Sequence, residues 1–179
     1  DAIMDQIIFF CVEMKIMIVG IGGVGGYIAG MVGQKYKNLT LIARGKRGEV
    51  LREHGVVLHS DFHGEKIVKD GVIRECAREV EEIQDLIFLC VKTYALEDVC
   101  QTLGSCVDDH TIIVPVMNGA DTAQRVREYL GKGLVVDAVI YTTAAANEDY
   151  SITQLGQYTR ILLGAVREEE HKAAKVSAG

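Results

Sequence analysis

A cluster of glycines stands between an apolar run of strand length and a segment with helical spacing. The run is KIMIVG (15–20), and the helical segment is VGGYIAGMVGQKY (24–36). Within the cluster, Gly20, Gly22 and Gly25 form the pattern G-x-G-x-x-G. Such glycines occur in phosphate-binding turns, in contacts between membrane helices and in close backbone packing. The rest of the chain has to decide among the three.

A membrane helix is one reading of this region. Residues 16–33 carry no charge and reach the lower length limit of a membrane span, and Gly22, Gly26 and Gly30 follow GxxxG spacing. The same stretch contains seven glycines, and each costs a helix roughly 1 kcal/mol relative to alanine. We therefore attribute the spacing to a helix packed on a sheet and expect no membrane partner.

Strand-like and helix-like segments alternate along the remaining chain. Alternation of this kind builds a parallel, doubly wound sheet with helices on both faces. We predict an α/β, Rossmann-type fold with a mostly parallel sheet. The expected strands are 15–20, 39–44, 85–92, 111–117 and 134–141, the expected helices are 24–36, 46–55, 94–105 and 120–131, and two hairpins are expected at 56–69, turning at 61–65, and at 151–164.

In that setting the glycine cluster predicts a dinucleotide-binding turn. Gly20 permits a tight turn, Gly22 lets the backbone approach a pyrophosphate, and Gly25 lets the helix pack closely on the strand. The start of the helix supplies free N–H groups and the positive end of its dipole. The candidate cofactor-binding turn comprises Gly20, Ile21, Gly22, Gly23, Val24 and Gly25.

The end of the second expected strand indicates which dinucleotide binds. An NAD site places an acidic residue there for the ribose 2′-hydroxyl, whereas this chain has Arg44, followed by Lys46 and Arg47. Basic groups suit the 2′-phosphate of NADP. The alternative is a solvated basic loop. We predict NADP(H) as the cofactor and Arg44 as the residue that contacts the phosphate.

Composition and charge narrow the functional classes further. The chain has 179 residues, of which 49% are hydrophobic, and a net charge of -6, which argues against a nucleic-acid or anionic-membrane partner. The five cysteines form no CxxC pair, and the histidines are not spaced for a metal, so we predict core thiols of a cytoplasmic protein and no metal. These cysteines are Cys11, Cys76, Cys90, Cys100 and Cys106.

Four segments carry a resemblance to a known family. KIMIVGIGGVGG, LIARGKRGEVLREHGVVL, DLIFLCVKTYALEDV and VPVMNGADT, in this order, resemble the N-terminal domain of ketopantoate reductase (2-dehydropantoate 2-reductase). The resemblance covers about residues 14–164, and its VKT and NG elements are more specific than the glycine pattern. It implies an oxidoreductase that reduces 2-dehydropantoate to (R)-pantoate with NADPH, in the pathway to pantothenate and coenzyme A.

Two further residues gain meaning from the resemblance. Lys92 ends an expected buried strand, and the family's lysine at this position lies beside cofactor and substrate, although a lysine leaving a strand for solvent is also possible. Asn118 precedes Gly119 at a strand-to-helix junction, where it could form a hairpin turn, cap the helix or point into the crevice. The resemblance favours the crevice, near nicotinamide and substrate.

The sequence also departs from the family pattern. Gly23 stands where alanine is common, Met117 stands where glutamine is frequent, and residues 147–156 match loosely. The family's general-acid lysine lies on a helical C-terminal domain that we expect to be missing here. Lys172 and Lys175 fall at the expected start of that domain, upstream of the catalytic lysine, so we assign no catalytic residue.

These observations divide the chain into three parts. Residues 1–13 are an expected leader or upstream extension without signal-peptide features, 14–164 are the NADP-binding domain, and 165–179 are a linker or the start of a truncated helical domain. We expect the chain to bind NADPH without appreciable turnover. Two alternatives remain, a reductase of another 2-keto acid and a non-catalytic nucleotide-sensing domain. The sequence leaves a homo-oligomer open.

Overall fold

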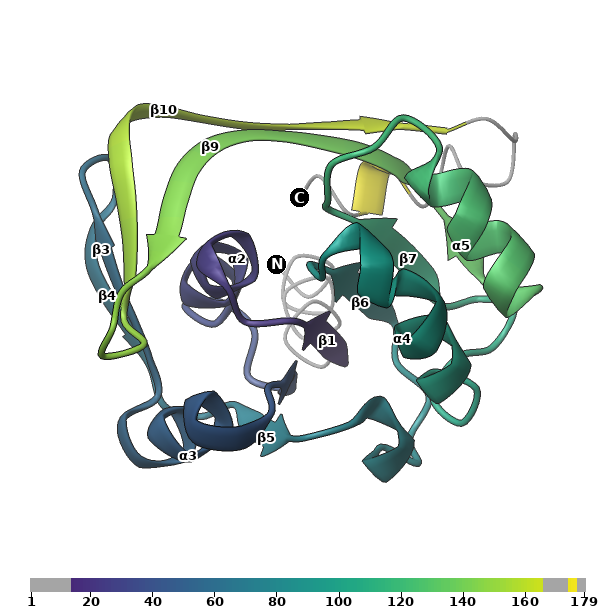
Figure 1. Ribbon diagram of the computed structural model, residues 1–179, viewed down its shortest axis with the longest axis horizontal. Coiled ribbons are helices and arrows are strands. Elements are labelled where there is room, and N and C mark those ends of the chain that lie inside the picture. Colours follow the sequence, from purple (N-terminus) through teal and green to yellow (C-terminus); the bar gives the residue numbers. More distant parts are fainter. Residues whose placement is uncertain (1–13, 166–173, 177–179) are drawn as a thin grey trace, which may run out of the picture.

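The computed structural model describes residues 14–165 and 174–176, and its centre is a six-stranded parallel sheet (Figure 1). The strand order β5-β2-β1-β6-β7-β8 corresponds to 3-2-1-4-5-6 along the chain, which is the order of the Rossmann fold. The predicted fold class is therefore confirmed. The strands are β1 (Ile16–Val19), β2 (Leu39–Ile42), β5 (Val72–Arg74), β6 (Leu86–Leu89), β7 (Ile112–Pro115) and β8 (Leu134–Val135).

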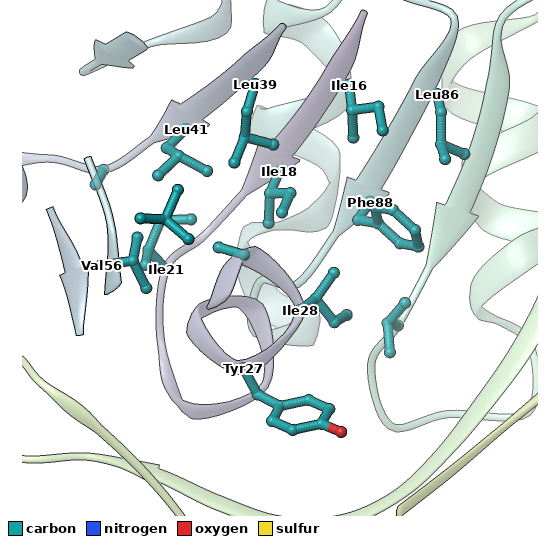
Figure 2. Close-up of a cluster of buried hydrophobic side chains, with 14 of the residues drawn as sticks. Ile16, Ile18, Ile21, Tyr27, Ile28, Leu39, Leu41, Val56, Leu86 and Phe88 are labelled. Carbon is teal, nitrogen blue, oxygen red and sulfur yellow. The ribbon is translucent and has the colours of Figure 1, made fainter. Parts of the chain in front are cut away.

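Helices cover both faces of this sheet because side chains alternate along its buried strands. In β1, Ile16 and Ile18 join the core on the side of α2 (Gly23–Val32) and α3 (Gly45–His54). Met17 and Val19 join the core on the side of α4 (Leu96–Thr102) and α5 (Thr122–Leu130). Figure 2 shows the first core, where Ile18 and Phe88 point toward Ile28 of α2. Each fully buried side chain of this kind contributes roughly 1.5–3 kcal/mol.

A second sheet lies on the other side of α2. Its order is β4-β3-β10-β9, and in Figure 1 the long strands β9 and β10 arc over α2. The pair β3–β4 is the first predicted hairpin, with His59 opposite Glu65, and β10 joins it by pairing parallel to β3. The strands are β3 (Val56–Ser60), β4 (Gly64–Val68), β9 (Asp137–Ala146) and β10 (Ile152–Gly164).

Helix α2 fits between the two sheets because one row of its residues is glycine. The row begins at Gly23, the first residue of the helix, and ends at Gly33, directly after its last residue. Its members are three or four residues apart, so they lie on one face of the helix. Helix-on-sheet packing is confirmed for Gly26 and Gly30 of the GxxxG spacing, whereas a Cβ at Gly22 would meet no atom within 4 Å. A Cβ atom at Gly23, Gly26, Gly30 or Gly33 would collide with Ala144 of β9, Ile152 of β10, Leu58 of β3 or Val68 of β4, respectively.

The expectation of one strand over 134–141 is wrong. The chain pairs with β7 only as far as Val135 and then crosses to the second sheet as β9. Arg127 of α5 spans the break, because its Nη2 donates to the Val135 carbonyl at 2.8 Å and to the Asp137 carboxylate at 2.9 Å. The local pattern is apolar on both sides of the break, so it could not show that the strand changes sheets.

The expectation of a hairpin within 151–164 is also wrong. These residues form the single strand β10, which pairs antiparallel with β9. The irregularity that resembles a turn is a bulge, where the register shifts between Leu155 and Arg160 and Gly156 adopts φ 84°. The sequence analysis also missed β5, which has only three residues, and two short 3-10 helices, η1 (Ala77–Glu79) and η2 (Thr93–Ala95).

Several expectations concern the ends of the chain. The leader at 1–13 and Lys172 lie outside the described residues, and of 165–179 only 165 and 174–176 are described. Within the described part of the chain, no helix is long and apolar enough to cross a membrane. The same residues contain no group of three or more His, Cys, Asp or Glu side chains placed to hold a metal ion.

Candidate functional site

The predicted site residues come together at one edge of the central sheet. Gly20 follows β1, Arg44 follows β2, Lys92 follows β6 and Asn118 follows β7. These four strands are neighbours in the order β2-β1-β6-β7 and all run parallel. Their carboxyl ends therefore share an edge, which is where open α/β sheets bind ligands.

Two glycines of the turn are required by its geometry. Gly20 has φ 90°, and a Cβ there would lie 2.7 Å from the Cys90 carbonyl oxygen, so only glycine fits. A Cβ at Gly25 would collide with the Gly20 carbonyl oxygen. Gly20 thus permits the turn, and Gly25 lets the start of the helix pack closely on the residue that follows the strand. Gly23 is also required, but by the second sheet: the β9 backbone at Ala144 leaves no room for the alanine that is usual in the family.

The start of α2 has the properties of an anion site. Gly22 is the N-cap, with no side-chain cap and no acidic residue in the first turn, so no group of this helix neutralises its positive end. A Cβ at Gly22 would meet no atom within 4 Å. The first bond within the helix runs from the Gly26 N–H to the Gly22 carbonyl, which leaves the preceding N–H groups to other acceptors. Open space beside such donors fits a pyrophosphate.

The three predicted basic residues differ in their contacts. Lys46 pairs with Glu49 at 3.1 Å, and this hydrogen bond raises the pKa of Lys46. Arg47 donates from Nη1 to the Ile21 carbonyl oxygen at 2.5 Å. Arg44 is exposed and, within 14–165 and 174–176, its side chain makes no hydrogen bond or ion pair. Arg44 is therefore the basic residue of this group that is free to bind an added anion.

Sequence reasoning missed a cation beside Arg44. Arg74 is the last residue of β5, which pairs with β2 so that Arg74 lies opposite Ile42. Its carbonyl oxygen accepts the Ala43 N–H at 2.9 Å, and its side chain is exposed. The signal was weak, because a strand as short as β5 has too few residues to show an alternating pattern.

The loops that carry Lys92 and Asn118 are joined to one another. Thr93 Oγ1 donates to the Asn118 carbonyl at 3.3 Å, and Thr122 Oγ1 donates to the Gly119 carbonyl at 3.0 Å. Both Lys92 and Asn118 are exposed. The capping alternative for Asn118 is wrong, because Asp121 is the N-cap of α5. The hairpin alternative is wrong as well, since a helix follows.

Cys90 lies directly beneath the turn. A Cβ at Gly25 would lie 3.0 Å from its Cβ atom, and burial raises the pKa of the Cys90 thiol to about 12. The thiol therefore stays protonated near neutral pH. It packs against the turn as a small uncharged side chain and cannot supply a thiolate nucleophile.

A separate pocket of about 440 Å³ contains no residue of the glycine turn. It lies between the end of α3, β3 and the loop that joins β9 to β10. Its lining residues include His54, His59 and Tyr150. Sequence reasoning did not find Tyr150, whose ring also faces the Arg47 guanidinium with 5.0 Å from ring centroid to Cζ.

A parallel sheet in this order, with a glycine turn and an uncapped helix start at its carboxyl edge, defines the class of Rossmann-type dinucleotide-binding domains. The family model described as ketopantoate reductase PanE/ApbA matches residues 16–168. The chain therefore belongs to this family of oxidoreductases, whose members depend on NAD(P).

Individual relatives agree with this assignment. The chain is 28% identical over 151 residues to the uncharacterized oxidoreductase YkpB of Bacillus subtilis, a match that covers 84% of this chain and 48% of that protein. It is similar to the crystal structure of 2-dehydropantoate 2-reductase from Porphyromonas gingivalis, with TM-score 0.77, 26% identity and coverage of 92% and 61%.

A third similarity is to a ternary structure of D-mandelate dehydrogenase with NADH and anilino(oxo)acetate. The TM-score is 0.76 at 24% identity, and the match covers 92% of this chain and 52% of that one. At this identity the likeness concerns the fold. The chain spans about half the length of the curated relatives it matches.

Proposed function

We propose that this chain is the cofactor-binding half of an NADPH-dependent reductase that acts on a 2-keto acid in the cytoplasm. The proposed reaction is the reduction of 2-dehydropantoate to (R)-pantoate, which serves pantothenate and coenzyme A biosynthesis. The observation that carries the cofactor choice is Arg44, which follows β2 and has no polar partner in the described part of the chain. An exposed guanidinium at this position supports binding of a 2′-phosphate.

Each candidate residue has a proposed task. The N–H groups around Gly22 hold the pyrophosphate, Lys92 attracts the carboxylate of the keto acid, and Asn118 contacts nicotinamide and substrate. Bound NADPH supplies a hydride to the ketone carbon. The proton donor of the resembled family lies in the half of the relatives that this chain does not match, so we assign no general acid here.

Titration with NADPH and NADH tests the cofactor choice. We expect NADPH to bind more tightly than NADH. Arg44→Ala should raise the dissociation constant of NADPH by about 10- to 100-fold, because a hydrogen bond to a charged group contributes about 1.5–3 kcal/mol. NADH binding should change little. Nucleotide fluorescence measures both dissociation constants.

The matched control is Lys46→Ala, which removes a cation from the same loop that already pairs with Glu49. This variant should keep the wild-type preference. A preference for NADH, or an unchanged preference in Arg44→Ala, would contradict Arg44 as the phosphate contact. Failure of the folded chain to bind either nucleotide would overturn the proposed function as a whole.

The two alternatives are separated by turnover. Similarity in fold to D-mandelate dehydrogenase favours testing other 2-keto acids beside 2-dehydropantoate. We expect these 179 residues to bind NADPH without appreciable turnover, and the longer protein to oxidise NADPH with 2-dehydropantoate. Turnover by the 179 residues at ordinary enzyme rates would contradict the first expectation. Nucleotide binding without any keto-acid turnover in the longer protein would favour a sensing domain.

A further inference from the structure

We propose that Arg47 is a positioning residue that fixes the orientation of the phosphate-binding turn, and that Tyr150 holds Arg47 in place. This inference rests on the proposed function. Arg47 lies in the first turn of α3, its Nη1 donates to the Ile21 carbonyl oxygen at 2.5 Å, and its guanidinium lies over the Tyr150 ring at 5.0 Å. These contacts connect the turn to the loop between β9 and β10.

The contact with Ile21 controls the peptide that follows it. A trans peptide is planar, so its C=O and N–H groups point in opposite directions. By holding the Ile21 carbonyl, Arg47 therefore directs the Gly22 N–H the opposite way. Gly22 has no atom within 4 Å of its Cβ position and no side chain of its own, so side-chain packing does not hold this peptide. The arginine supplies that restraint.

The loop that carries Tyr150 is well fixed. Tyr150 has φ 67° and is the one non-glycine residue with positive φ in the described part of the chain. Its N–H donates to the Asn147 carbonyl at 3.0 Å, while Ser151 donates from its N–H and Oγ to Asp149. A tyrosine in this conformation costs about 1–3 kcal/mol. That strain is retained in a loop that sets the aromatic ring against Arg47.

This geometry separates Arg47 from Arg44. The Arg47 guanidinium is half-buried and engaged with a carbonyl and an aromatic ring, whereas Arg44 is exposed. Loss of a phosphate contact changes NADPH binding alone. Loss of the turn's orientation weakens the pyrophosphate contact, which NADPH and NADH share. The two roles therefore predict different ratios of the two dissociation constants.

The test measures the NADPH and NADH dissociation constants of folded variants. Each variant either unfolds at the same urea concentration as the wild type or is assayed at a urea concentration well below its own unfolding midpoint. Arg47→Met should weaken both nucleotides by about tenfold and leave their ratio unchanged, since a hydrogen bond to a charged group is lost. Arg47→Lys should recover only part of the loss, because lysine lacks the planar fork. Tyr150→Leu should weaken both nucleotides, and Tyr150→Phe should restore them.

Arg52→Met is the matched control, because it removes an exposed arginine of α3 that lies 3.9 Å from Glu75. It should change neither constant. If Arg47→Met alters the NADPH-to-NADH ratio as Arg44→Ala does, Arg47 binds the 2′-phosphate and the inference is wrong. It is also wrong if Arg47→Met leaves both constants at wild-type values while the wild type binds NADPH, a result that would leave the proposed function intact.

Discussion

Gly22 and Gly25 belong to one motif but are constrained by different neighbours. At Gly25 the constraint is internal, because a Cβ would collide with the Gly20 carbonyl oxygen. At Gly22 the surrounding space is empty and φ is -90°, which any residue adopts. The protein itself therefore does not require glycine at 22. A ligand that approaches the backbone closely would require it.

Substituting each glycine by alanine separates the two constraints. Gly25→Ala should lower the free energy of unfolding by about 1–3 kcal/mol, as overpacking does, and should also impair NADPH binding. Gly22→Ala should change stability by at most about 1 kcal/mol, because alanine is only a poorer N-cap. It should nevertheless weaken NADPH binding by about tenfold, as its methyl group occupies space beside the helix start.

Urea unfolding measures the stability of both variants, and nucleotide titration measures their affinity for NADPH. Full affinity in a folded Gly22→Ala protein would argue against pyrophosphate binding there.

The bulge in β10 is organised by one buried amide. Gln154 is fully buried and accepts the Ser60 hydroxyl at 2.5 Å. Its Nε2 donates to the carbonyls of Leu155 at 2.7 Å and Gly156 at 2.9 Å. The side chain thus replaces the partners that these carbonyls lose where the register shifts. At the scale of elements, it joins β3 to the bent strand that covers α2.

Replacing this amide should destabilise the second sheet. Gln154→Leu leaves the buried Ser60 hydroxyl without its acceptor and removes the donor to two part-buried carbonyls. We expect the free energy of unfolding to fall by about 1–3 kcal/mol, the cost of a buried unsatisfied group. Gln157→Leu is the control, because Gln157 is exposed and its side chain makes one hydrogen bond in the described part of the chain, to the Asp61 carbonyl. Its effect should stay below about 1 kcal/mol. Equal urea midpoints for the two variants would show that Gln154 does not organise the bulge.

At the scale of the whole molecule, protonated thiols lie in the interior beside the central sheet. Cys100 and Cys106 belong to the core that α4 and α5 cover, and burial raises the pKa of each to about 11 from an ordinary value of 9.0. Cys76, Cys90, Cys100 and Cys106 are all free thiols. The expected core position is confirmed for Cys100 and Cys106, whereas Cys90 packs against the other core and Cys76 is half-buried outside both.

These thiols predict a loss of stability in alkaline solution. Between pH 9 and pH 11 the unfolded thiols lose protons that the native thiols keep, so the native state becomes less favourable as the pH rises. Each thiol should lower the free energy of unfolding by about 1.4 kcal/mol per pH unit in this range. Urea unfolding of the wild type and of a Cys100→Ala, Cys106→Ala variant measures the effect. A slope against pH that is equal in both proteins would contradict it.

Much of the central sheet could be predicted because its strands are short apolar runs that alternate with helical spacing. The runs that became β1, β6 and β7 are buried on both faces, so their local pattern and their place in the fold agree. The place of the residues after these strands could be predicted too, since the carboxyl ends of parallel strands lie at one edge of the sheet. Gly20, Arg44 and Lys92 were placed at this edge by such reasoning, whereas the crevice position of Asn118 was favoured by the family resemblance.

The second sheet was not predictable in the same way. Residues 134–141 do not continue as one strand, and Arg127 of a different helix bonds to residues on both sides of the break. Where β10 runs on instead of turning back, Gln154 bonds to Ser60, a residue far away in the sequence. Long-range hydrogen bonds of this kind leave no periodic signal in the segments that they join.

The sequence by itself determined the fold class, the glycine turn and the basic residues near it, because strand and helix periods, turn residues and charge are local properties. Only the tertiary structure showed which neighbour each of them meets. In the folded chain, the glycine row of α2 packs against the second sheet, Arg47 donates to the Ile21 carbonyl, and Arg44 is exposed. The reason is physical. The partner of a side chain is decided by packing between elements, and the local sequence around Arg44, Lys46 and Arg47 carries no information about that packing.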